Sequence, residues 1–592
     1  MAYCHERGKK LYVTLNNLQT AEELEEIDDY LRFLSEIRPD AVILQDLGLL
    51  RRIRELGLKL DIHVSTMLNT HNAPTLALLA RHGVTRVVLS KDIALKDVHR
   101  LRTETAATGI ELEYFVHGDT CIAHHGSCAQ SGVVLGASSN KGRCYKSCRW
   151  DYELVDGATG KRVASFNDGP YVLAHNDLCL LSHIPEVVRA GIATLKIEGR
   201  MRPAEYVAPI VAVYRRAVDR YAEDPSGYLF NIEDLRSTVE DRVRDLTTGS
   251  AFHQVRLESV GSSGEREPKI FSKPVKEKRL DFDDILTGSF ERCFTVETIL
   301  RNPSSPRFSV HVGDMASALA AMTAGADAIF IGGTVSLARA IPWSLEQIKR
   351  CIAEGRRRGV KVFVATPSYL LWRELEECRE MVRALADSPP DGWLLPDMGA
   401  ISLMREEGRG ALIGDFSLNV MNRSAAEFLA GEGLELVALS PELSFRQATE
   451  AAHGSSVKTE VLVHGAVAGM RLDHCLIAAL AGNRTSDDVC PAPCRGRGYG
   501  LRDGAGEVHS IEPDQYCRNT LLIGADLCVL PFVRSFAAAG FASLRYEAQY
   551  DPPEHVGKVV DLYRRAIDDP SFALDRDGWE SLCASAPRPL NL

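Results

Sequence analysis

The sequence predicts an α/β protein of two tandem (β/α)8 barrels, the first of which lacks its N-terminal strands. An internal duplication and an alternation of short apolar runs with amphipathic helical segments lead to this prediction. The length of 592 residues adds a third observation, because one hydrophobic core does not grow to that size. An open, doubly wound sheet is the alternative architecture for the same alternation.

The duplication consists of ordered matches that lie 346 to 349 residues apart. FVHG at 115–118 matches LVHG at 462–465, and DLC at 177–179 matches DLC at 526–528. The segment LKIEGRMRPAEYVAPIVAVYRRAVD also matches the later segment LRYEAQYDPPEHVGKVVDLYRRAID. Ordered matches at nearly one spacing indicate two copies of one module.

Strand-like runs differ in number between the copies. The second copy has eight: FSVHV, ADAIFIGG, VKVFVAT, GWLLPD, ALIGDFS, LELVALS, TEVLVHG and ASLRYEA. The first has six: LYVTLN, AVILQD, DIHVST, RVVLS, LEYFVHG and TLKIEG. We therefore predict a first, N-terminally incomplete barrel at 1–222, a small appendage and linker at 223–307, and a second barrel at 308–592. Either the start site differs, or a protein partner completes the first barrel.

Composition and charge narrow the class of protein. With 45% apolar and 25% charged residues the chain has an ordinary soluble composition. The sequence contains neither a run of 18 apolar residues nor a signal-peptide core, which predicts a cytoplasmic protein without a membrane span. The net charge of -11 argues against a generally basic, nucleic-acid-coating surface but leaves a local basic groove open. HExxH, GxSxG and P-loop signatures are absent from the sequence.

Ten of the fifteen cysteines fall in two windows, at 121–179 and 475–528. Disulfides are rare in a reducing compartment, and clustering favours metal ligation over scattered burial. Zinc and an iron–sulfur cluster both suit a set of soft thiolates. The candidate ligands, with Cys528 as an alternative to Cys517, are Cys121, Cys128, Cys144, Cys148, Cys475, Cys490, Cys494 and Cys517.

Other polar residues near the cysteines are weaker candidates. Glu198 and Arg200 follow a strand end, where they could bind or polarise a substrate or pair with each other. His124 and His125 could act as a base or lie solvated in a loop. Four cations interleave the first cysteine window and could contact an anion or form a solvated loop face. They are Lys141, Arg143, Lys146 and Arg149.

The segments EYFVHGDTCIAHHGSCAQS, GRCYKSCRWDYEL and LKIEGRMRPAEY resemble the signature of the collagenase-like peptidase U32 family. Asp119-Thr120 and Gln130 depart from that pattern, and the second copy has lost the first cysteine and the Glu-Gly-Arg triplet. Several members of the family look like oxygen-independent hydroxylation factors for a tRNA uridine, an rRNA cytidine or a ubiquinone precursor, and some hold a [4Fe–4S] cluster through four cysteines. The resemblance thus favours one [4Fe–4S] cluster per copy, with zinc as the alternative.

Three hypotheses for function remain. The first is an iron–sulfur protein that hydroxylates RNA, most readily tRNA, or a small quinone precursor, with an unknown electron or hydroxyl donor and with His117, Glu198 and Arg200 as candidate catalytic residues. The second is a collagenase-like peptidase, with Cys121 or Cys128 as nucleophile and His117 or its neighbours at 124–125 as base. The third is a non-catalytic iron–sulfur scaffold. We expect the working site in the first copy, which keeps the fuller signature.

Overall fold

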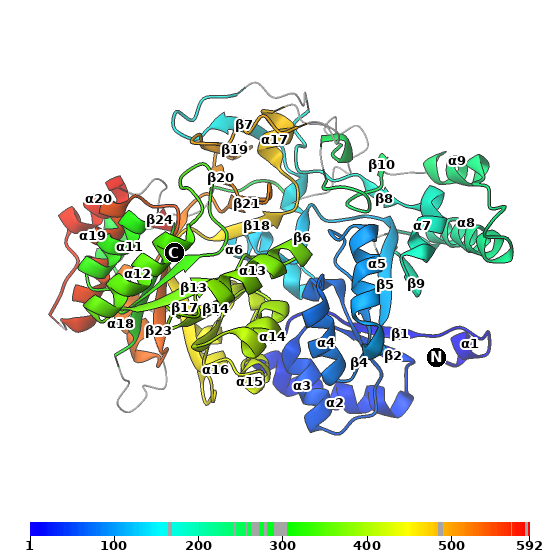
Figure 1. The fold of residues 1–592 in the computed structure, drawn as a ribbon, viewed down its shortest axis with the longest axis horizontal. Helices are drawn as coiled ribbons and strands as arrows, with labels where there is room; N and C mark the ends of the chain where they lie inside the picture. Colours follow the sequence, from blue (N-terminus) through cyan, green and yellow to red (C-terminus); the bar gives the residue numbers. More distant parts are fainter. Residues whose placement is uncertain are drawn as a thin grey trace.

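The computed structural model of the chain describes residues 1–163, 169–200, 202–240, 244–255, 257–261, 272–276, 281–288, 305–482, 489–569, 571–585 and 590–591. Figure 1 shows the two copies side by side, the first in blue and cyan and the second in green to red, with a small sheet above the junction between them. No described helix is both long enough and apolar enough to span a bilayer.

The second copy is a closed barrel of eight parallel strands, as the sequence predicts. Closure comes from the pairing of its first strand with its last, along the whole register from Arg307 opposite Ser543 to Val312 opposite Ala548. The strands are β11 (Arg307–Val312), β12 (Ala328–Gly332), β13 (Lys361–Ala365), β14 (Gly392–Leu395), β15 (Ala411–Gly414), β16 (Leu436–Ala438), β17 (Lys458–Gly465) and β23 (Ser543–Ala548).

Helices follow most strands of this barrel, and their N-termini are capped by side chains that the sequence supplies. Ser344 and Gln347 form a capping box at the start of α12, and Asp397 caps α14. The helices are α11 (Met315–Thr323), α12 (Leu345–Arg358), α13 (Trp372–Ala384), α14 (Met398–Glu407), α15 (Arg423–Gly431), α16 (Phe445–Ala452), α17 (Leu476–Leu480), α18 (Val533–Ala538), α19 (Pro553–Asp568) and α20 (Arg576–Ser585).

The first copy is an open arc that has the six predicted strands and lacks the two that the sequence predicts to be missing, and its described strands do not close into a barrel. Six parallel strands form it, and within the described chain β1 and β9 do not pair with each other. In the second barrel, β11 and β12 lie between β13 and β23, which are the counterparts of β1 and β9. The described residues of the first copy contain no counterpart of β11 or β12. The strands are β1 (Tyr12–Leu15), β2 (Ala41–Leu44), β3 (Ile62–Val64), β4 (Val84–Val88), β5 (Glu111–Gly118) and β9 (Thr194–Ile197).

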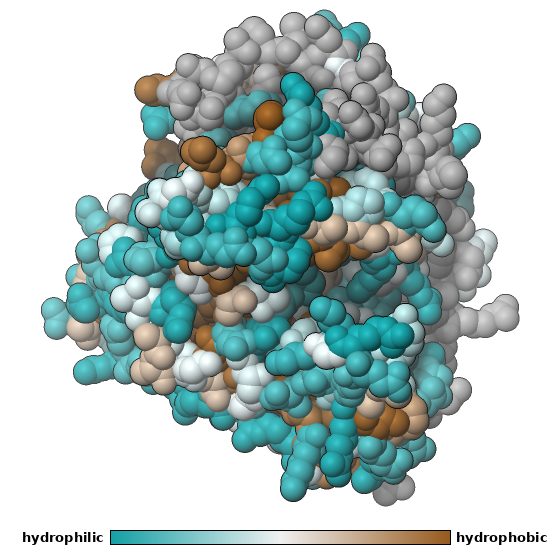
Figure 2. All heavy atoms as spheres, turned by 90° about the vertical axis from the view of Figure 1, so that its right-hand side faces the viewer, coloured by the Kyte–Doolittle hydropathy of each residue, from teal (hydrophilic) through white to brown (hydrophobic). Residues whose placement is uncertain are grey.

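Helices of the first copy repeat the order of the second. They are α1 (Ala2–His5), α2 (Ala21–Ile37), α3 (Leu47–Glu55), α4 (Ala73–Arg81), α5 (Leu95–Glu104), α6 (Gln130–Leu135), α7 (Ile184–Arg189) and α8 (Ala204–Glu223). The side of the molecule on the right of Figure 1, where this copy lies, is largely hydrophilic, with small apolar areas between polar side chains (Figure 2).

The copies pack through equivalent helices in a reciprocal way: α3 contacts α15, and α4 contacts α14. Asn422, which caps α15, donates a hydrogen bond to Asp46 at 2.9 Å, and Asn72, which caps α4, donates one to Asp397 at 3.3 Å. Because the two contacts use matching residues, the interface resembles that of a two-fold symmetric dimer.

Glycine permits this close approach. A Cβ on Gly48 would lie 2.4 Å from Oδ1 of Asn422, and one on the matching Gly399 would lie 2.1 Å from Oδ1 of Asn72. Any larger residue at either position would push the two copies apart.

A third sheet is shared by both copies. Its six antiparallel strands run in the order β6, β18, β21, β20, β19, β7, with one strand of the first copy at each edge. The strands are β6 (Ala123–Cys128), β7 (Tyr152–Asp156), β18 (Ala468–Leu472), β19 (Tyr499–Asp503), β20 (Val508–Pro513) and β21 (Asn519–Leu522). The long loops that carry the cysteines thus build one structure together, around a small core of their own.

Described parts of the segment between the copies lie on both of them. Strand β10 (Leu246–Thr247) pairs with β8 (Asp177–Cys179) of the first copy, while Arg576 of the second pairs with Asp283 at 2.8 Å. Helices α9 (Ile232–Glu240) and α10 (Phe282–Leu286) belong to this segment, and β22 (Asp526–Cys528) and β24 (Leu590–Asn591) extend the second sheet. The Gly- and Ser-rich stretch at 262–271 and residues 289–304 lie outside the described residues.

Candidate functional site

The first four cysteines gather on one side of the shared sheet. Cys121 follows β5, Cys128 ends β6, and Cys144 and Cys148 come from the loop and short turn beyond. Desolvation raises the pKa of Cys121 to about 12 although the residue reaches the surface, and the thiols of Cys148 and Cys144 contribute to the rise. All four are free thiols that lie close enough to influence one another's ionisation.

The second set gathers in the same way, and it uses Cys517. Burial raises the pKa of Cys475 to about 12, and Cys517, Cys494 and Cys490 add to it. Cys528 is instead buried on β22, where its thiol neighbour is Cys583. Of the two alternatives for the fourth thiol, the geometry therefore favours Cys517 over Cys528.

The chemistry of these sets suits a soft metal centre. Each is made of four thiols, the ligands that zinc and iron–sulfur clusters share. No group of three or more His, Cys, Asp or Glu among the described residues is drawn together tightly enough to hold an ion. Because thiol protons must leave when a metal binds, the raised pKa values mean that loading either set would release protons. Metal ligation by the eight cysteines stays a prediction.

The three residues named as catalytic candidates are neighbours through the backbone, since the Glu198 N–H donates to the His117 carbonyl at 2.8 Å, but no side-chain to side-chain hydrogen bond or ion pair joins them among the described residues. His117 is buried against Tyr214 of α8, outside the strand arc, with Nδ1 3.4 Å from the tyrosine hydroxyl. Burial lowers the pKa of His117 to about 4. Glu198 accepts a hydrogen bond from the backbone N–H of Arg200 at 2.8 Å, and the side chain of Arg200 points to solvent. The same histidine–tyrosine pair recurs in the second copy, which is what a structural role predicts.

Three of the four cations in the first cysteine window are in ion pairs. Lys146 and Arg149 pair with Asp119, and Lys141 pairs with Glu23. Burial opposes ionisation of Asp119, but Arg244 together with Lys146 and Arg149 lowers its pKa to about 2. The fourth cation, Arg143, is exposed. The three paired cations are therefore explained by ion pairs within the chain and do not indicate an anion-binding site.

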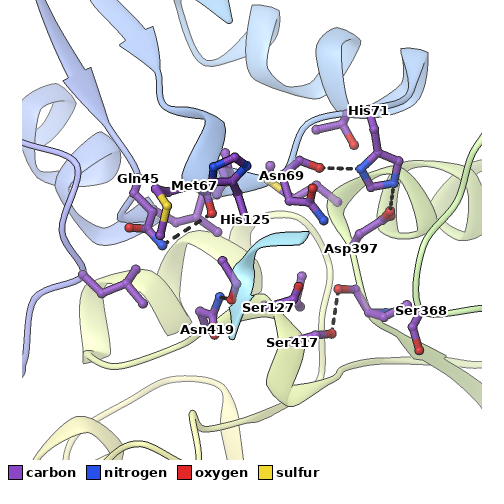
Figure 3. A pocket seen from close by; sticks show the side chains of 18 of the residues that line it. Gln45, Met67, Asn69, His71, His125, Ser127, Ser368, Asp397, Ser417 and Asn419 are labelled. Atoms are coloured by element: carbon purple, nitrogen blue, oxygen red, sulfur yellow. Dashed lines mark hydrogen bonds and ion pairs between the residues drawn. The ribbon is translucent and has the colours of Figure 1, made fainter. Parts of the chain in front are cut away.

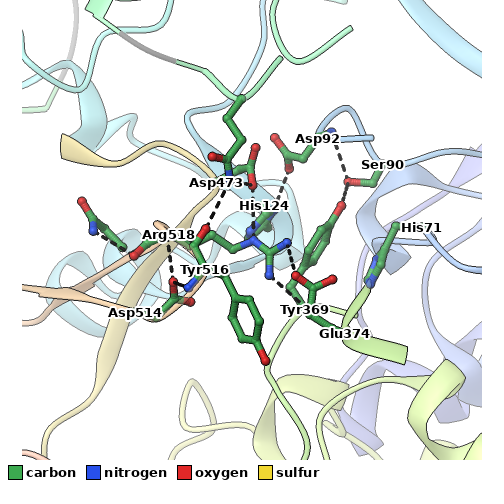
Figure 4. Close-up of polar contacts among 12 residues, drawn as sticks. His71, Ser90, Asp92, His124, Tyr369, Glu374, Asp473, Asp514, Tyr516 and Arg518 are labelled. Carbon is green, nitrogen blue, oxygen red and sulfur yellow. Dashed lines mark hydrogen bonds and ion pairs between the residues drawn. The ribbon is translucent and has the colours of Figure 1, made fainter. Parts of the chain in front are cut away.

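Of the two adjacent histidines, His124 is buried and His125 is half-buried. His124 contacts Asp92, with Nδ1 2.7 Å from Oδ2, and its ring stacks on Tyr369 of the second copy at 4.1 Å between centroids. His71 stacks on the other face of Tyr369 at 3.8 Å (Figure 4). His125 lies 3.4 Å from the Thr66 hydroxyl, and burial lowers the pKa of His125 to about 4.

Arg518 completes this buried polar network. It lies between Asp473 and Glu374, at 3.3 and 3.1 Å, and donates to the Tyr369 carbonyl at 3.2 Å (Figure 4). The network fastens the loop after β13 to the first copy.

A groove opens between the copies beside that network (Figure 3). Asn419 donates a hydrogen bond to the Gly126 carbonyl across it at 2.7 Å. Buried Oε1 of Gln45 and Oδ1 of Asn69 have no hydrogen-bond partner among the described residues. Polar side chains of both copies line the groove, among them Gln45, Asn69, His71, His125, Ser127, Ser368, Asp397, Ser417 and Asn419.

A second cavity occupies the carboxyl end of the second barrel, and the sequence analysis missed it. His311, Asp415, Glu547 and Gln549 line it, above the fully buried Arg545. Arg545 forms ion pairs with Asp415, Glu547 and, at 3.3 Å, Glu460. Charged residues within strand-like runs, as in TEVLVHG and ASLRYEA, could have indicated this cavity, because an ionisable group inside a closed barrel needs partners.

The cavities adjoin one another. The groove and the barrel cavity share Ser368 and Pro396, and a smaller pocket lined by Cys128 shares Phe416 and Arg471 with the barrel cavity. We call these adjoining spaces together the junction cleft. Cys128, a member of the first thiol set, thus lies next to the mouth of the second barrel.

Known proteins similar to this chain include RNA-modifying ones. The tRNA hydroxylation protein P1 of Bacillus subtilis is 32% identical over 277 residues, which are 46% of this chain and 63% of that protein. A 23S rRNA 5-hydroxycytidine synthase of Escherichia coli is 32% identical over 279 residues, 46% of this chain and 41% of that protein. A collagenase of Porphyromonas gingivalis is 28% identical over 226 residues, which are 37% of this chain and 53% of that protein. The matches thus span less than two thirds of each relative.

A sequence profile shows the family of this chain. A solved U32 peptidase structure aligns at a TM-score of 0.27 and 13% identity, over 44% of this chain and 98% of that one. The sequence profile named Peptidase family U32 matches residues 1–259 and again 313–587, so it covers both copies. The chain therefore belongs to peptidase family U32.

Proposed function

We propose that this protein takes part in hydroxylation of a base in tRNA or rRNA, with an iron–sulfur centre in each of its two thiol sets. The observation that carries the proposal is the gathering of four thiols in each copy, with the first set next to a cleft between the copies. Relatives named for tRNA and rRNA hydroxylation, at 32% identity, support the choice of RNA as substrate.

Hydroxylation replaces a C–H bond of the base by C–OH, which is a two-electron oxidation of the base. A hydroxyl-donating co-substrate must accept those two electrons. A bound iron–sulfur cluster would supply one-electron redox chemistry at its thiol set. The residues of the chain would hold it: the shared sheet and its core fix the loops, and the neutral thiols give up their protons as ligands.

A strain that lacks the gene provides the first test. Mass spectrometry of its tRNA and rRNA nucleosides should reveal loss of one hydroxylated pyrimidine, restored by the intact gene and not by a Cys128→Ser variant. Protein purified without oxygen should contain iron and sulfide. Loss of a hydroxylated quinone with unchanged RNA would move the substrate to the quinone class, and a zinc-loaded, iron-free protein would refute the iron–sulfur assignment.

A peptidase is the second candidate, favoured by the buried Asp92–His124 pair and by the similar collagenase. Such a pair orients an imidazole as a base. The His124 ring, however, stacks on Tyr369, and no described thiol is hydrogen-bonded to it. Gelatin hydrolysis that disappears in both His124→Gln and Cys128→Ala proteins, and survives iron chelation, would establish the peptidase.

A further inference from the structure

Equivalent positions of the two copies differ at the junction cleft. In the first copy His124 is paired with Asp92 and covered by Tyr369, so this side of the cleft is filled. The matched positions in the second copy are Arg471 and Glu442. At this position the second copy therefore has a cation, whereas the first copy has a histidine that contacts Asp92.

Arg471 is not neutralised in the same way. Glu442 accepts a hydrogen bond from Asn140 at 2.8 Å and does not pair with Arg471. The Arg471 guanidinium carbon lies 5.1 Å from the centroid of the Phe416 ring. Within the described part of the chain Arg471 has no ion pair, and it lines the barrel cavity, the pocket lined by Cys128 and a third pocket near Arg518.

The barrel cavity below Arg471 is acidic. Three carboxylates, those of Asp415, Glu460 and Glu547, surround the single guanidinium of Arg545. Burial alone would raise the pKa of Glu547, but His311 and Arg545, with a further contribution from Arg471, outweigh it and lower that pKa, which keeps the carboxylate charged.

Unused hydrogen-bonding capacity also faces this cavity. Thr366 is 3% exposed, and its hydroxyl has no partner among the described residues. Gln549 lies at the rim, where its amide nitrogen is 2.7 Å from Nδ1 of His311.

We propose that the mouth of the second barrel binds one nucleotide of the RNA, with its base directed into the barrel and its phosphate on Arg471. The proposal rests on the proposed function and deepens it. Carboxylates accept hydrogen bonds from the exocyclic amino or ring N–H groups of a base, as Glu and Asp do from cytosine N4. Phe416 lines the same mouth, and a guanidinium that has no ion-pair partner within the described residues binds phosphate strongly.

The site would combine both copies. The nucleotide would lie in the barrel of the second copy, while the adjoining pocket ends at Cys128 of the first copy's thiol set. This moves the expected working site from the first copy to the junction. Removal of a base from its stack into such a pocket is the usual way in which enzymes reach a base atom.

The test measures binding of CMP, UMP and the matching nucleosides to the full chain, purified without oxygen, by titration calorimetry. Arg471→Gln should weaken monophosphate binding at least about tenfold and change nucleoside binding less than about twofold, because only the phosphate contact is lost. Arg471→Lys should retain part of the affinity. Arg446→Gln, at an exposed arginine on α16 that pairs with Glu450, is the matched control and should change neither.

A second variant tests the base end. Glu547→Gln should weaken nucleosides and nucleotides alike, because the acceptor that faces the base loses its charge. Inorganic phosphate that competes as well as CMP would reduce the site to a phosphate site and overturn the nucleotide assignment. Absence of CMP and UMP binding up to about 5 mM, or unchanged affinity in a folded Arg471→Gln protein, would refute the proposal outright.

These results are separable from the proposed function. RNA hydroxylation that persists in an Arg471→Gln strain would refute the site and leave the function standing. Nucleotide binding that depends on Arg471, in a protein whose deletion alters no RNA, would keep the site and refute the function.

Discussion

A histidine at the end of a central strand meets a tyrosine from the last barrel helix in both copies. His117 lies beside Tyr214, and His464 beside Tyr563, with 3.4 Å between Nδ1 and the hydroxyl in each case. Each hydroxyl donates to a strand carbonyl at 2.7 Å. Burial lowers the pKa of His117 to about 4 and that of His464 to about 3. Both imidazoles are thus neutral at pH 7.

Buried neutral histidines predict a loss of stability in acid. Above pH 6.5 His117 is neutral in the folded and the unfolded chain and contributes nothing to the pH dependence. As pH falls from 6.5 towards 4, the unfolded chain takes up a proton that the folded chain does not. By pH 5 this costs about 2 kcal/mol for His117. Urea unfolding of a His117→Asn variant should therefore lose about that much less stability between pH 7 and 5 than the unmodified chain, and an equal loss would contradict the account.

The helix pairs between the copies are the elements that hold the molecule together. Asn422 is fully buried; it caps α15 and donates to Asp46 and to the Gln19 carbonyl. Its removal would leave the buried Asp46 carboxylate without one of its donors.

We therefore expect Asn422→Ala to lower the free energy of unfolding by about 2–4 kcal/mol, the sum of a lost cap and an under-satisfied buried carboxylate. Ser344→Ala removes the exposed cap of α12, far from the interface, and should cost only about 1 kcal/mol. Equal effects in chemical denaturation would show that the contact between the copies adds nothing.

The loops between β20 and β21 and around β22 give an element-scale test of the second thiol set. Cys517 has a left-handed backbone, φ 59°, in the loop that faces Cys475, whereas Cys528 is packed in the barrel sheet. Cys517→Ser should remove about half of the iron from protein purified without oxygen. Cys528→Ser is the matched control and should retain all of it. The reverse result would reassign the fourth ligand.

At the scale of the whole molecule the copies are not independent domains. One hydrophobic cluster contains core residues of both, and the shared sheet takes strands from both. Contacts of this extent couple the unfolding of the parts.

Calorimetry should therefore show one cooperative transition for the full chain, although multidomain proteins of this length commonly show several. Asn422→Ala should shift the whole transition to lower temperature rather than split it. Two separated transitions, one for each copy, would contradict the shared hydrophobic core of the structure.

Much of this architecture follows from local patterns in the chain. Apolar runs such as VKVFVAT are typical of central parallel strands, which are buried on both faces. All fourteen strand-like runs named from the sequence lie in the two parallel sheets. Three cysteines of each set also recur at matched spacings in the two copies, which the sequence shows directly. The sequence also indicates that the first copy lacks two strands, but whether β1 and β9 still pair with each other depends on the tertiary structure.

The sequence by itself determined the duplication, the strands and the cysteines that gather. Only the tertiary structure decided which residues surround the cleft. His124 and Arg471 occupy matching positions, yet His124 contacts Asp92, while Arg471 has no ion pair within the described residues. Arg545 and its three carboxylates come together from strands up to 130 residues apart. Charge balance in a cavity is set by such distant neighbours, and a single chain read in order does not contain their distances.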